Sequence, residues 1–545
     1  MAKPTVYSAR KIITMDPINP AATHVAVRDG RILAVGTLET VAGWGSYELD
    51  DRFAGKILMP GLVEGHSHVT EGTVWQHCYV GFYDRRSPDG ALWRGIGSID
   101  RVLERLREAE RQLADPDQPL IGWGFDPIFL DRSLTAADLD RVSATRPILV
   151  THASFHMLNV NSLVMARAGI TADTHVEVIQ KDAEGNPTGQ FQSVPANYLA
   201  YKAIGTDLLS RGSAADELRL FARSALAAGV TTVTDLFNDL PDPVVDNYRA
   251  VTADPEFPVR LVPALKGFGN DRNGAERLRE LVRYNTDKLR FGIAKLIVDG
   301  SIQGFTARLQ WPGYYNGAPN GLWYIAPEDI KRVLKSFHEA GFQVHIHTNG
   351  NQATEATLEA VEAVLAQAPR WGHRHTLQHC QMADAAQFRR MAALGVCVNL
   401  FCNHIFYWGD AHLEQTMGPD RAARMDAAAT AMRCGVPFAM HSDAPITPLG
   451  PLFTAWCAVN RRTASGRILG ESERISVEVA LRAITLGAAY TLKIDGEIGS
   501  IEVGKFADFA VLEDDPTVVS PEALKDIPIW GTVLGGRAFP GPRAS

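Results

Sequence analysis

The sequence has no long apolar run and no long basic run. No uncharged apolar stretch reaches the roughly 18 residues that a membrane span needs, and the first residues hold no apolar signal core. We therefore expect a cytoplasmic protein without a membrane partner. The net charge of -8 is spread along the chain, and the basic residues form no stretch that would follow a phosphate backbone, which argues against a nucleic-acid partner.

Paired cysteine motifs are also absent. The six cysteines never occur with C-x-x-C spacing: Cys78, Cys380, Cys397, Cys402, Cys434 and Cys457. This spacing favours buried free thiols over a disulfide framework or a cysteine zinc site. With 545 residues, 46% of them hydrophobic, the chain can bury a large core in several domains or in one large barrel with additions.

Both ends of the chain are rich in predicted β-strands. Near the N-terminus the expected strands are residues 5–7, 11–15, 24–27 and 32–36, with a hairpin turn at 28–31. Near the C-terminus they are residues 499–504, 507–512 and 532–534. Two β-rich ends around an α/β middle predict one small β-sandwich domain, built from residues 1–57 and 496–545.

The middle of the chain alternates apolar strands with amphipathic helices, which is typical of β-α units around a parallel sheet. Eight strands are predicted, at residues 57–63, 231–234, 259–263, 293–298, 343–347, 376–379, 396–400 and 437–440. That number predicts an α/β fold with a (β/α)8 TIM barrel over residues 58–495. Helical signals between these strands are clearest from Pro327 to Gly341 and from Ala214 to Gly229.

The stretch between the first and second barrel strands, residues 75–213, is too long for a β-α loop. We expect an inserted subdomain there that serves as a substrate lid. It carries aromatic and polar side chains, among them Trp75, Trp123, Phe155, His156 and Asn161. An alternative interpretation is that these aromatic residues form the core of the insertion itself.

Potential metal ligands lie at or near the ends of the predicted strands, where TIM barrels carry their active sites. They are His66, His68, Lys295, His347, His379 and Asp443. In extended backbone, His66 and His68 point the same way and can reach one metal, although an H-x-H pair also occurs in polar loops. Asp443 could bind a metal and act as the general base, or it could cap the segment that follows.

Several of these motifs together resemble the metal-dependent amidohydrolase superfamily, and best its YtcJ-like branch, which includes N-substituted formamide deformylases. The matching segments are Pro60–His68, Asp182–Gly189, Lys295–Ser301, His345–Gly350, His375–His379 and Ser442–Pro445. Three features depart from the pattern: Glu64 replaces an aspartate, Asn351 replaces an aspartate, and residues 188–193 lack a glutamate. These departures affect the expected substrate more than the chemistry.

The resemblance implies that the six strand-end residues hold one or two divalent ions, most simply Zn²⁺. On the fifth strand the family's histidine, which precedes glycine by three positions, corresponds to His347, so His345 belongs to the pocket or lies behind the ligands. His373 and His375 are interpreted as structural or supporting residues. The resemblance also implies that CO2 carboxylates Lys295 and that the resulting carbamate bridges two ions. Without the carbamate, Lys295 would be a core lysine paired with Asp299 or Asp235, and the centre would be mononuclear.

We therefore predict hydrolysis of a non-peptide, amide-type C–N bond in a small, apolar or aromatic substrate, with Asp443 as general base. Besides the residues of the insertion named above, His345, Phe406 and Trp408 are candidates for substrate binding. An ester, lactone or cyclic imide hydrolase would use the same ligands. A non-catalytic scaffold would be free to lose them, and this sequence keeps all six. A homo-oligomer is expected from the resemblance alone.

Overall fold

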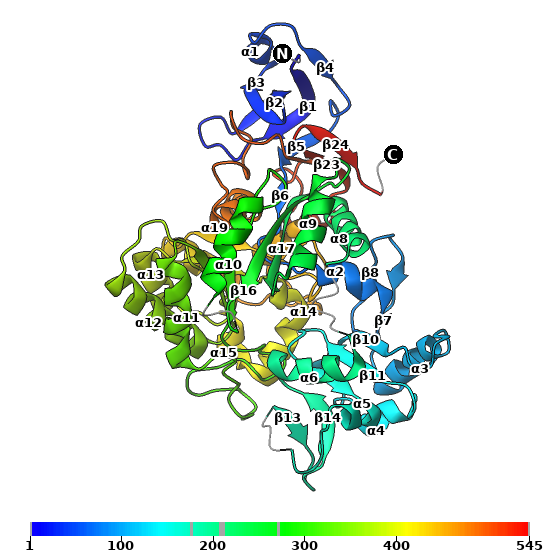
Figure 1. Cartoon of the computed structure of the whole chain (residues 1–545). Coiled ribbons are helices and arrows are strands. Elements are labelled where there is room, and N and C mark those ends of the chain that lie inside the picture. The colour runs from blue at the N-terminus through cyan, green and yellow to red at the C-terminus, as the bar shows by residue number, and fades with distance from the viewer. Residues whose placement is uncertain (1–2, 175–177, 207–212, 270–272, 543–545) are drawn as a thin grey trace.

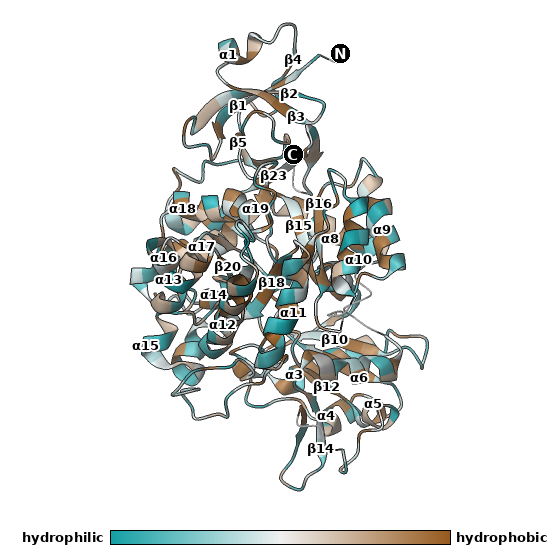
Figure 2. Cartoon of the chain, turned by 60° about the vertical axis from the view of Figure 1, so that its left-hand side comes forward, coloured by the Kyte–Doolittle hydropathy of each residue, from teal (hydrophilic) through white to brown (hydrophobic). Residues whose placement is uncertain are grey.

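The computed structural model describes residues 3–174, 178–206, 213–269 and 273–542. The remaining parts of the predicted domain spans lie outside the described residues. In Figure 1 the strands of both chain ends lie at the top, the parallel sheet lies in the middle, and β13 and β14 of the insertion lie at the bottom. A 60° turn gives the same order in Figure 2.

Strands from the two chain ends form one hydrogen-bonded sheet in the order β24-β23-β22-β5-β1-β2-β3, with β4 paired to β1. Its strands are β1 (Thr5–Ile13), β2 (Ala21–Arg28), β3 (Arg31–Gly36), β4 (Glu48–Asp50), β5 (Ile57–Pro60), β22 (Phe509–Leu512), β23 (Ile529–Leu534) and β24 (Arg537–Pro540). The predicted strand 5–7 and residues 11–13 of the predicted strand 11–15 belong to one strand, β1, with a shift in register. Residues 499–504 do not form the predicted strand, because Gly499 and Gly504 adopt positive φ angles in turns.

The second large sheet has eight parallel strands that curl into a TIM-like barrel. In spatial order they are β6 (Leu62–Val63), β15 (Val230–Asn238), β16 (Arg260–Lys266), β17 (Ile293–Ile297), β18 (Gln343–Thr348), β19 (Thr376–His379), β20 (Cys397–Leu400) and β21 (Phe438–Met440). The two edges meet just beyond β6 and β21, where Ser67 and Ala444 form a parallel bridge and His68 N–H donates to the Ala444 carbonyl at 2.9 Å.

The predicted first barrel strand, residues 57–63, is divided at Gly61 between the two sheets. Its first half, β5, pairs with β1 and β22, and only β6 pairs with barrel strand β15. A side chain at residue 61 would not fit, because its Cβ atom would lie 2.0 Å from Thr231 Oγ1. The predicted boundary between residues 57 and 58 consequently falls inside β5.

Helices surround the barrel and connect its strands. They are α2 (Thr70–Thr73), α8 (Ala215–Ala227), α9 (Asp242–Ala253), α10 (Gly274–Leu281), α11 (Pro327–Glu339), α12 (Asn351–Gln367), α13 (Ala385–Leu394), α14 (Asn403–Ala411), α15 (Gly418–Ala422), α16 (Ala428–Arg433), α17 (Pro451–Asn460), α18 (Val477–Arg482) and α19 (Ala488–Thr491). The short helix α1 (Leu38–Ala42) packs instead on β2 and β3 of the terminal sheet. In α11 the apolar stripe of Ile330, Val333 and Phe337 is fully buried, as its helical spacing predicts. No helix among the described residues combines the length and apolar character that crossing a bilayer requires.

Residues between α2 and α8 form a separate six-stranded sheet with its own helices. The strands are β7 (Cys78–Tyr79), β10 (Leu120–Phe125), β11 (Ile148–His152), β12 (Leu158–Val160), β13 (Ile179–Lys181) and β14 (Pro187–Phe191), and β8 (Arg85–Arg86) pairs with β9 (Leu92–Trp93). The helices are α3 (Ile99–Glu110), α4 (Ala136–Asp140), α5 (Ser162–Arg167) and α6 (Val194–Ile204). Val102, Leu106 and Val150 belong to a buried cluster within this segment, so it has a core of its own.

A buried ion pair connects the barrel to the terminal sheet. Arg260 on β16 donates from Nη1 to Asp508 Oδ2 at 2.6 Å, just before β22, and the two side chains are 2% and 3% exposed. The other Asp508 oxygen accepts from Gly535 N–H. The guanidinium therefore depends on this carboxylate for its charge compensation.

We expect Asp508→Ala to lower the free energy of unfolding by about 3–5 kcal/mol, because it leaves the Arg260 charge buried and unpaired. The urea midpoint, followed by circular dichroism, measures this change. Glu104→Ala breaks the exposed pair between Arg101 and Glu104 and is the control, with an expected change below about 1 kcal/mol. Equal effects of the two substitutions would contradict the role assigned to the buried pair.

Candidate metal centre

The six predicted ligands come together at the carboxyl ends of the barrel strands. His66 and His68 follow β6, Lys295 lies in β17, His347 in β18, His379 ends β19, and Asp443 follows β21. All six line one cavity of about 660 Å³. Strands far apart in the sequence therefore contribute to a single site.

Asp443 is the residue around which the imidazoles gather. Its Oδ1 atom lies 3.4 Å from His66 Nε2 and 3.3 Å from His68 Nε2, and its Oδ2 atom lies 3.8 Å from His379 Nδ1. The Oδ1 atom is buried, and among the described residues no group donates a hydrogen bond to it. Two imidazole nitrogens beside a carboxylate oxygen that lacks a donor form a ligand set that fits a divalent cation.

The electrostatic environment keeps this ligand set in the protonation states that bind metals. Burial lowers the pKa of His66, His347 and His379 well below 6.5, so each imidazole is neutral and retains a lone pair. Burial alone would raise the pKa of Asp443, but the neighbouring side chains of His68, His441 and Lys295 outweigh it and hold that pKa below its ordinary value.

Backbone conformation at two predicted ligands is unusual for residues other than glycine. The φ angle is +69° at His379 and +53° at Asp443. Such conformations cost on the order of 1–3 kcal/mol and concentrate at functional sites. The fold therefore holds these two side chains at strand ends against a local preference.

Lys295 is buried beside the histidines. Its Nζ atom lies 3.2 Å from His66 Nε2, and burial lowers its pKa to about 7. The Asp299 carboxylate accepts instead from the backbone N–H groups of Arg308, Asn349 and Gly350. The Asp235 carboxylate accepts from Tyr248 Oη, Asn238 Nδ2 and the backbone N–H of Val69. Neither carboxylate pairs with Lys295 in the described part of the chain, so the amine remains free for other chemistry.

The end of β18 is held by a close approach of two backbones. Any side chain at Gly350 would place its Cβ atom 1.8 Å from the Arg308 carbonyl oxygen. Only glycine lets the backbone approach Arg308 this closely, and Asp299 bonds to both segments. This contact explains why a glycine follows His347 by three positions.

A layer of polar side chains lies behind the predicted ligands. Gln378 Oε1 contacts His66 Nδ1 at 2.8 Å, and Gln378 Nε2 contacts His345 Nδ1 at 2.8 Å. His345 in turn bonds to the carbonyl of Thr491. His345 therefore supports the ligands from behind and does not line the cavity.

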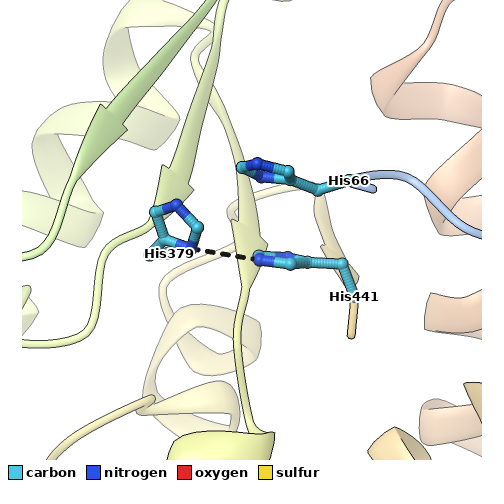
Figure 3. Close-up of side chains that lie close together, drawn as sticks. All are labelled: His66, His379 and His441. Atoms are coloured by element: carbon cyan, nitrogen blue, oxygen red, sulfur yellow. Dashed lines mark hydrogen bonds between the residues drawn. The ribbon is translucent and has the colours of Figure 1, made fainter. Parts of the chain in front are cut away.

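His441 is the residue of this centre that the sequence analysis missed. Its ring stacks on His66 with centroids 4.7 Å apart, and its Nε2 atom lies 3.1 Å from His379 Nδ1 (Figure 3). The three nitrogens of His66, His379 and His441 also come close enough to hold an ion. The available signal was its position directly after the predicted strand 437–440 and two residues before Asp443.

The predicted substrate-binding residues occupy different places. Phe155 and His156 line the cavity of the predicted ligands, whereas Trp123 and Trp408 line an adjoining cavity of about 410 Å³. Besides His345, three predicted residues line neither cavity: Trp75 donates to Glu71, Asn161 bonds to Ser143, Arg146 and Ile148, and Phe406 packs on Phe453 and Trp456. Thr70, Val194, Asp235, Phe237 and Ile446 also line the larger cavity and were not predicted.

Comparisons with known proteins show the family of the chain and a similar fold. A sequence model described as the amidohydrolase family matches residues 54–539. The putative amidohydrolase YtcJ of Bacillus subtilis is 29% identical over 96% of this chain and 97% of its own length. The N-substituted formamide deformylase of Arthrobacter pascens is 26% identical over 96% of each chain. A solved structure of an uncharacterized metal-dependent hydrolase from Pyrococcus horikoshii OT3 has a similar fold, with a TM-score of 0.73, 19% identity, and coverage of 95% of this chain and 99% of that one.

We expect Gln378→Leu to weaken metal binding about 10- to 100-fold, because His66 loses the hydrogen bond that fixes its ring orientation. Competition with a chelating dye measures the metal affinity. Thr357→Val, which removes a buried hydroxyl bonded only within α12, is the control and should leave the affinity unchanged. An affinity within twofold of the parent for Gln378→Leu would show that the glutamine does not support the ligand.

Proposed function

The chain belongs to the amidohydrolase family, and on that premise we propose that it hydrolyses a non-peptide, amide-type C–N bond in a small, apolar or aromatic molecule. The observation that carries the proposal is the Asp443 carboxylate between His66 and His68, with a buried oxygen that lacks a donor, at the wall of a cavity of about 660 Å³. The relative from Arthrobacter pascens, named for the removal of formyl groups from substituted formamides, supports this bond type.

The proposed ligands of the cation are His66, His68, His347, His379 and Asp443, with Lys295 completing the set. Neutral imidazoles and a carboxylate are ligands that Zn²⁺ accepts. A divalent cation bound there lowers the pKa of water and polarises a carbonyl. The protein residues then orient the substrate, exclude solvent and move protons.

Asp443 is the proposed proton carrier. Its carboxylate is ionised near neutral pH, because its pKa lies below the ordinary value. It therefore accepts a proton from the attacking water and transfers that proton to the departing nitrogen, which leaves as a neutral amine. The buried neutral histidines around it hold the carboxylate in place and do not compete for this proton.

Lys295 is proposed to react with CO2. Its neutral amine adds to the carbon of CO2, an N–C bond forms and one proton is released, so the residue changes from neutral to anionic. Support comes from the lowered pKa of about 7, which makes the neutral amine abundant, and from its contact with His66. A carbamate would supply two additional oxygen ligands and so allow a binuclear centre.

The insertion, residues 75–213, is proposed as the substrate lid. Its residues Ser154, Phe155, His156 and Val194 line the same cavity as the predicted ligands. Apolar side chains from the barrel side, Phe237 and Ile446, complete the wall. An apolar wall facing a polar centre suits a substrate with one polar bond and an apolar body. The two chain ends, 1–57 and 496–545, are likewise proposed to form one composite domain.

Asp443→Asn at saturating Zn²⁺ should reduce kcat for a panel of amides by about 10²- to 10⁴-fold, because the amide side chain cannot accept the proton. His66→Ala should lose both bound metal and activity. Steady-state kinetics and metal analysis of the purified proteins test both. His373→Asn is the control, because His373 is a buried histidine that bonds to the Leu394 carbonyl and does not line the cavity. We expect this substitution to leave kcat within about twofold of the parent value.

Two results would contradict this function. A parent protein that binds its full complement of metal but hydrolyses no amide or ester would be a non-catalytic scaffold. Faster cleavage of esters, lactones or cyclic imides than of matched amides would reassign the substrate class while leaving the centre intact.

Lys295 carboxylation has its own test. After equilibration with ¹³CO2, the parent protein should show a carbamate carbon signal by NMR that Lys295→Met lacks, and the variant should bind fewer ions. Lys288→Met serves as the matched control, since Lys288 is half-buried and bonds to backbone carbonyls. An unmodified Lys295 in the metal-loaded parent would contradict the binuclear centre.

A further inference from the structure

A second cavity, of about 410 Å³, lies between the insertion and the barrel. Tyr83 and Phe129 line it from the insertion, and Tyr407 and Trp408 line it from α14. It shares Pro445 and Ile446 with the cavity of the predicted ligands. These two residues stand two and three positions after Asp443, so the two cavities adjoin at the segment that follows this carboxylate.

Aromatic rings make up most of the wall of this second cavity. Tyr83 packs edge-on against Tyr407, with centroids 4.9 Å apart, and against Phe129, with centroids 5.4 Å apart. Tyr79 and Trp123 form a further pair at 4.8 Å. The faces of such rings carry negative electrostatic potential and attract cations, especially where water is excluded.

A buried carboxylate lies in the same wall. Asp126 is 7% exposed and accepts from Trp408 Nε1 at 2.6 Å and from Ile128 N–H at 3.4 Å. No lysine or arginine pairs with it within the described parts of the chain. Burial raises its pKa to about 7, which reflects the cost of a charge without a counter-ion. A cation in the cavity would offset that cost.

Arg85 is the other charged residue of this wall, and its charge is already compensated. Its guanidinium lies 3.6 Å from Glu71 and over the rings of Trp75 and Trp123. Its Nη1 atom donates to the Pro445 carbonyl at 2.9 Å, whereas its buried Nε and Nη2 atoms have no hydrogen-bond partner among the described residues. Asp126 therefore remains the uncompensated charge of the cavity.

We propose that the cavity around Asp126 binds an ammonium group, and that the substrate is an amide with a positively charged alkylammonium or quaternary ammonium group on one side of its scissile bond. The aromatic rings would surround the cation and Asp126 would supply the counter-charge, while the amide extends past Pro445 towards Asp443. The assignment of the amide rests on the proposed function. The cation site does not depend on it.

Binding can be tested apart from catalysis. Isothermal titration calorimetry at pH 8 compares benzyltrimethylammonium, neutral benzyl alcohol and anionic phenylacetate on the full-length protein and on its inactive His66→Ala variant. We expect the cation to bind both proteins at least 10-fold more tightly than the other two probes. Asp126→Asn should lower the affinity for the cation at least 10-fold and change that for benzyl alcohol less than twofold.

A second variant covers the case in which Asp126→Asn does not fold. Tyr83→Leu removes one aromatic face and should weaken binding of the cation about 3- to 30-fold, in line with the strength of cation–π contacts. Equal affinities for the three probes, or no binding of any, would overturn the cation site. Tighter binding of phenylacetate would also overturn it and assign the recognition to Arg85.

Hydrolysis of a matched pair of amides then separates the two proposals. The pair differs only in a trimethylammonium or a tert-butyl end group, and the ratio of their kcat/KM values should fall at least 10-fold in Asp126→Asn. If benzyltrimethylammonium binds as expected but neither amide is cleaved by the parent, the proposed function fails and the cation site stands. If both amides are cleaved equally well by the parent, the cation site has no part in substrate selection.

Discussion

Closure of the barrel is the constraint on which the site depends. Glu64, after β6, accepts from the backbone N–H and the hydroxyl of Ser442 at 2.9 and 2.8 Å, and the two residues are 378 positions apart in the sequence. Burial raises the pKa of Glu64 to about 8, so the contact is made at an energetic cost that a solvent-exposed pair would avoid. It fixes the register between the first and last strands, and that register puts His66 and His68 beside Asp443. A glutamate here reaches one bond further than the aspartate usual in the family, and it still meets both donors.

The barrel strands could be predicted because each is a short apolar run with helical sequence on either side. Seven of the eight predicted strands correspond to β15 through β21 within a few residues. The boundaries of the first barrel strand could not be predicted, because β5 and β6 are both buried and apolar. The break between them depends on the contact of Gly61 with Thr231. Strand β24 escaped prediction because Arg537–Pro540 is short and its β character comes from pairing with β23. The local sequence pattern predicts individual strands, whereas hydrogen bonding between distant segments determines the sheet to which each strand belongs.

The convergence of the six candidate ligands on one cavity was predictable for a different reason, namely that TIM barrels place strand ends together. The sequence could not distinguish side chains that line a cavity from side chains that pack in the core. Trp75, Trp123 and Phe406 occur in similar aromatic stretches, yet only Trp123 lines a cavity. Asn161 is buried, but its Nδ2 atom donates to the carbonyls of Ser143 and Arg146, and its Oδ1 atom accepts from Val164 N–H as the N-cap of α5. Gln378 and His441 carried no motif that distinguishes them from core polar residues, and their roles follow from contacts with His66 and His379 that exist only after the barrel closes.

The contact between Arg85 and Pro445 links substrate choice to the ligand loop. Arg85 belongs to the insertion, and the carbonyl it binds is two residues from Asp443, so the insertion helps to hold the loop that carries the proposed proton carrier. Glu71, which lies close to His68 in the sequence, faces the same guanidinium. The insertion is thus anchored to both edges where the barrel closes, by side chains that do not line the metal cavity. Residues farther along the insertion, such as Phe129 or Asp126, can therefore change without displacing the ligands. Arg85 both anchors the insertion and lines the second cavity, whereas Phe129 and Asp126 line that cavity without bonding to Pro445.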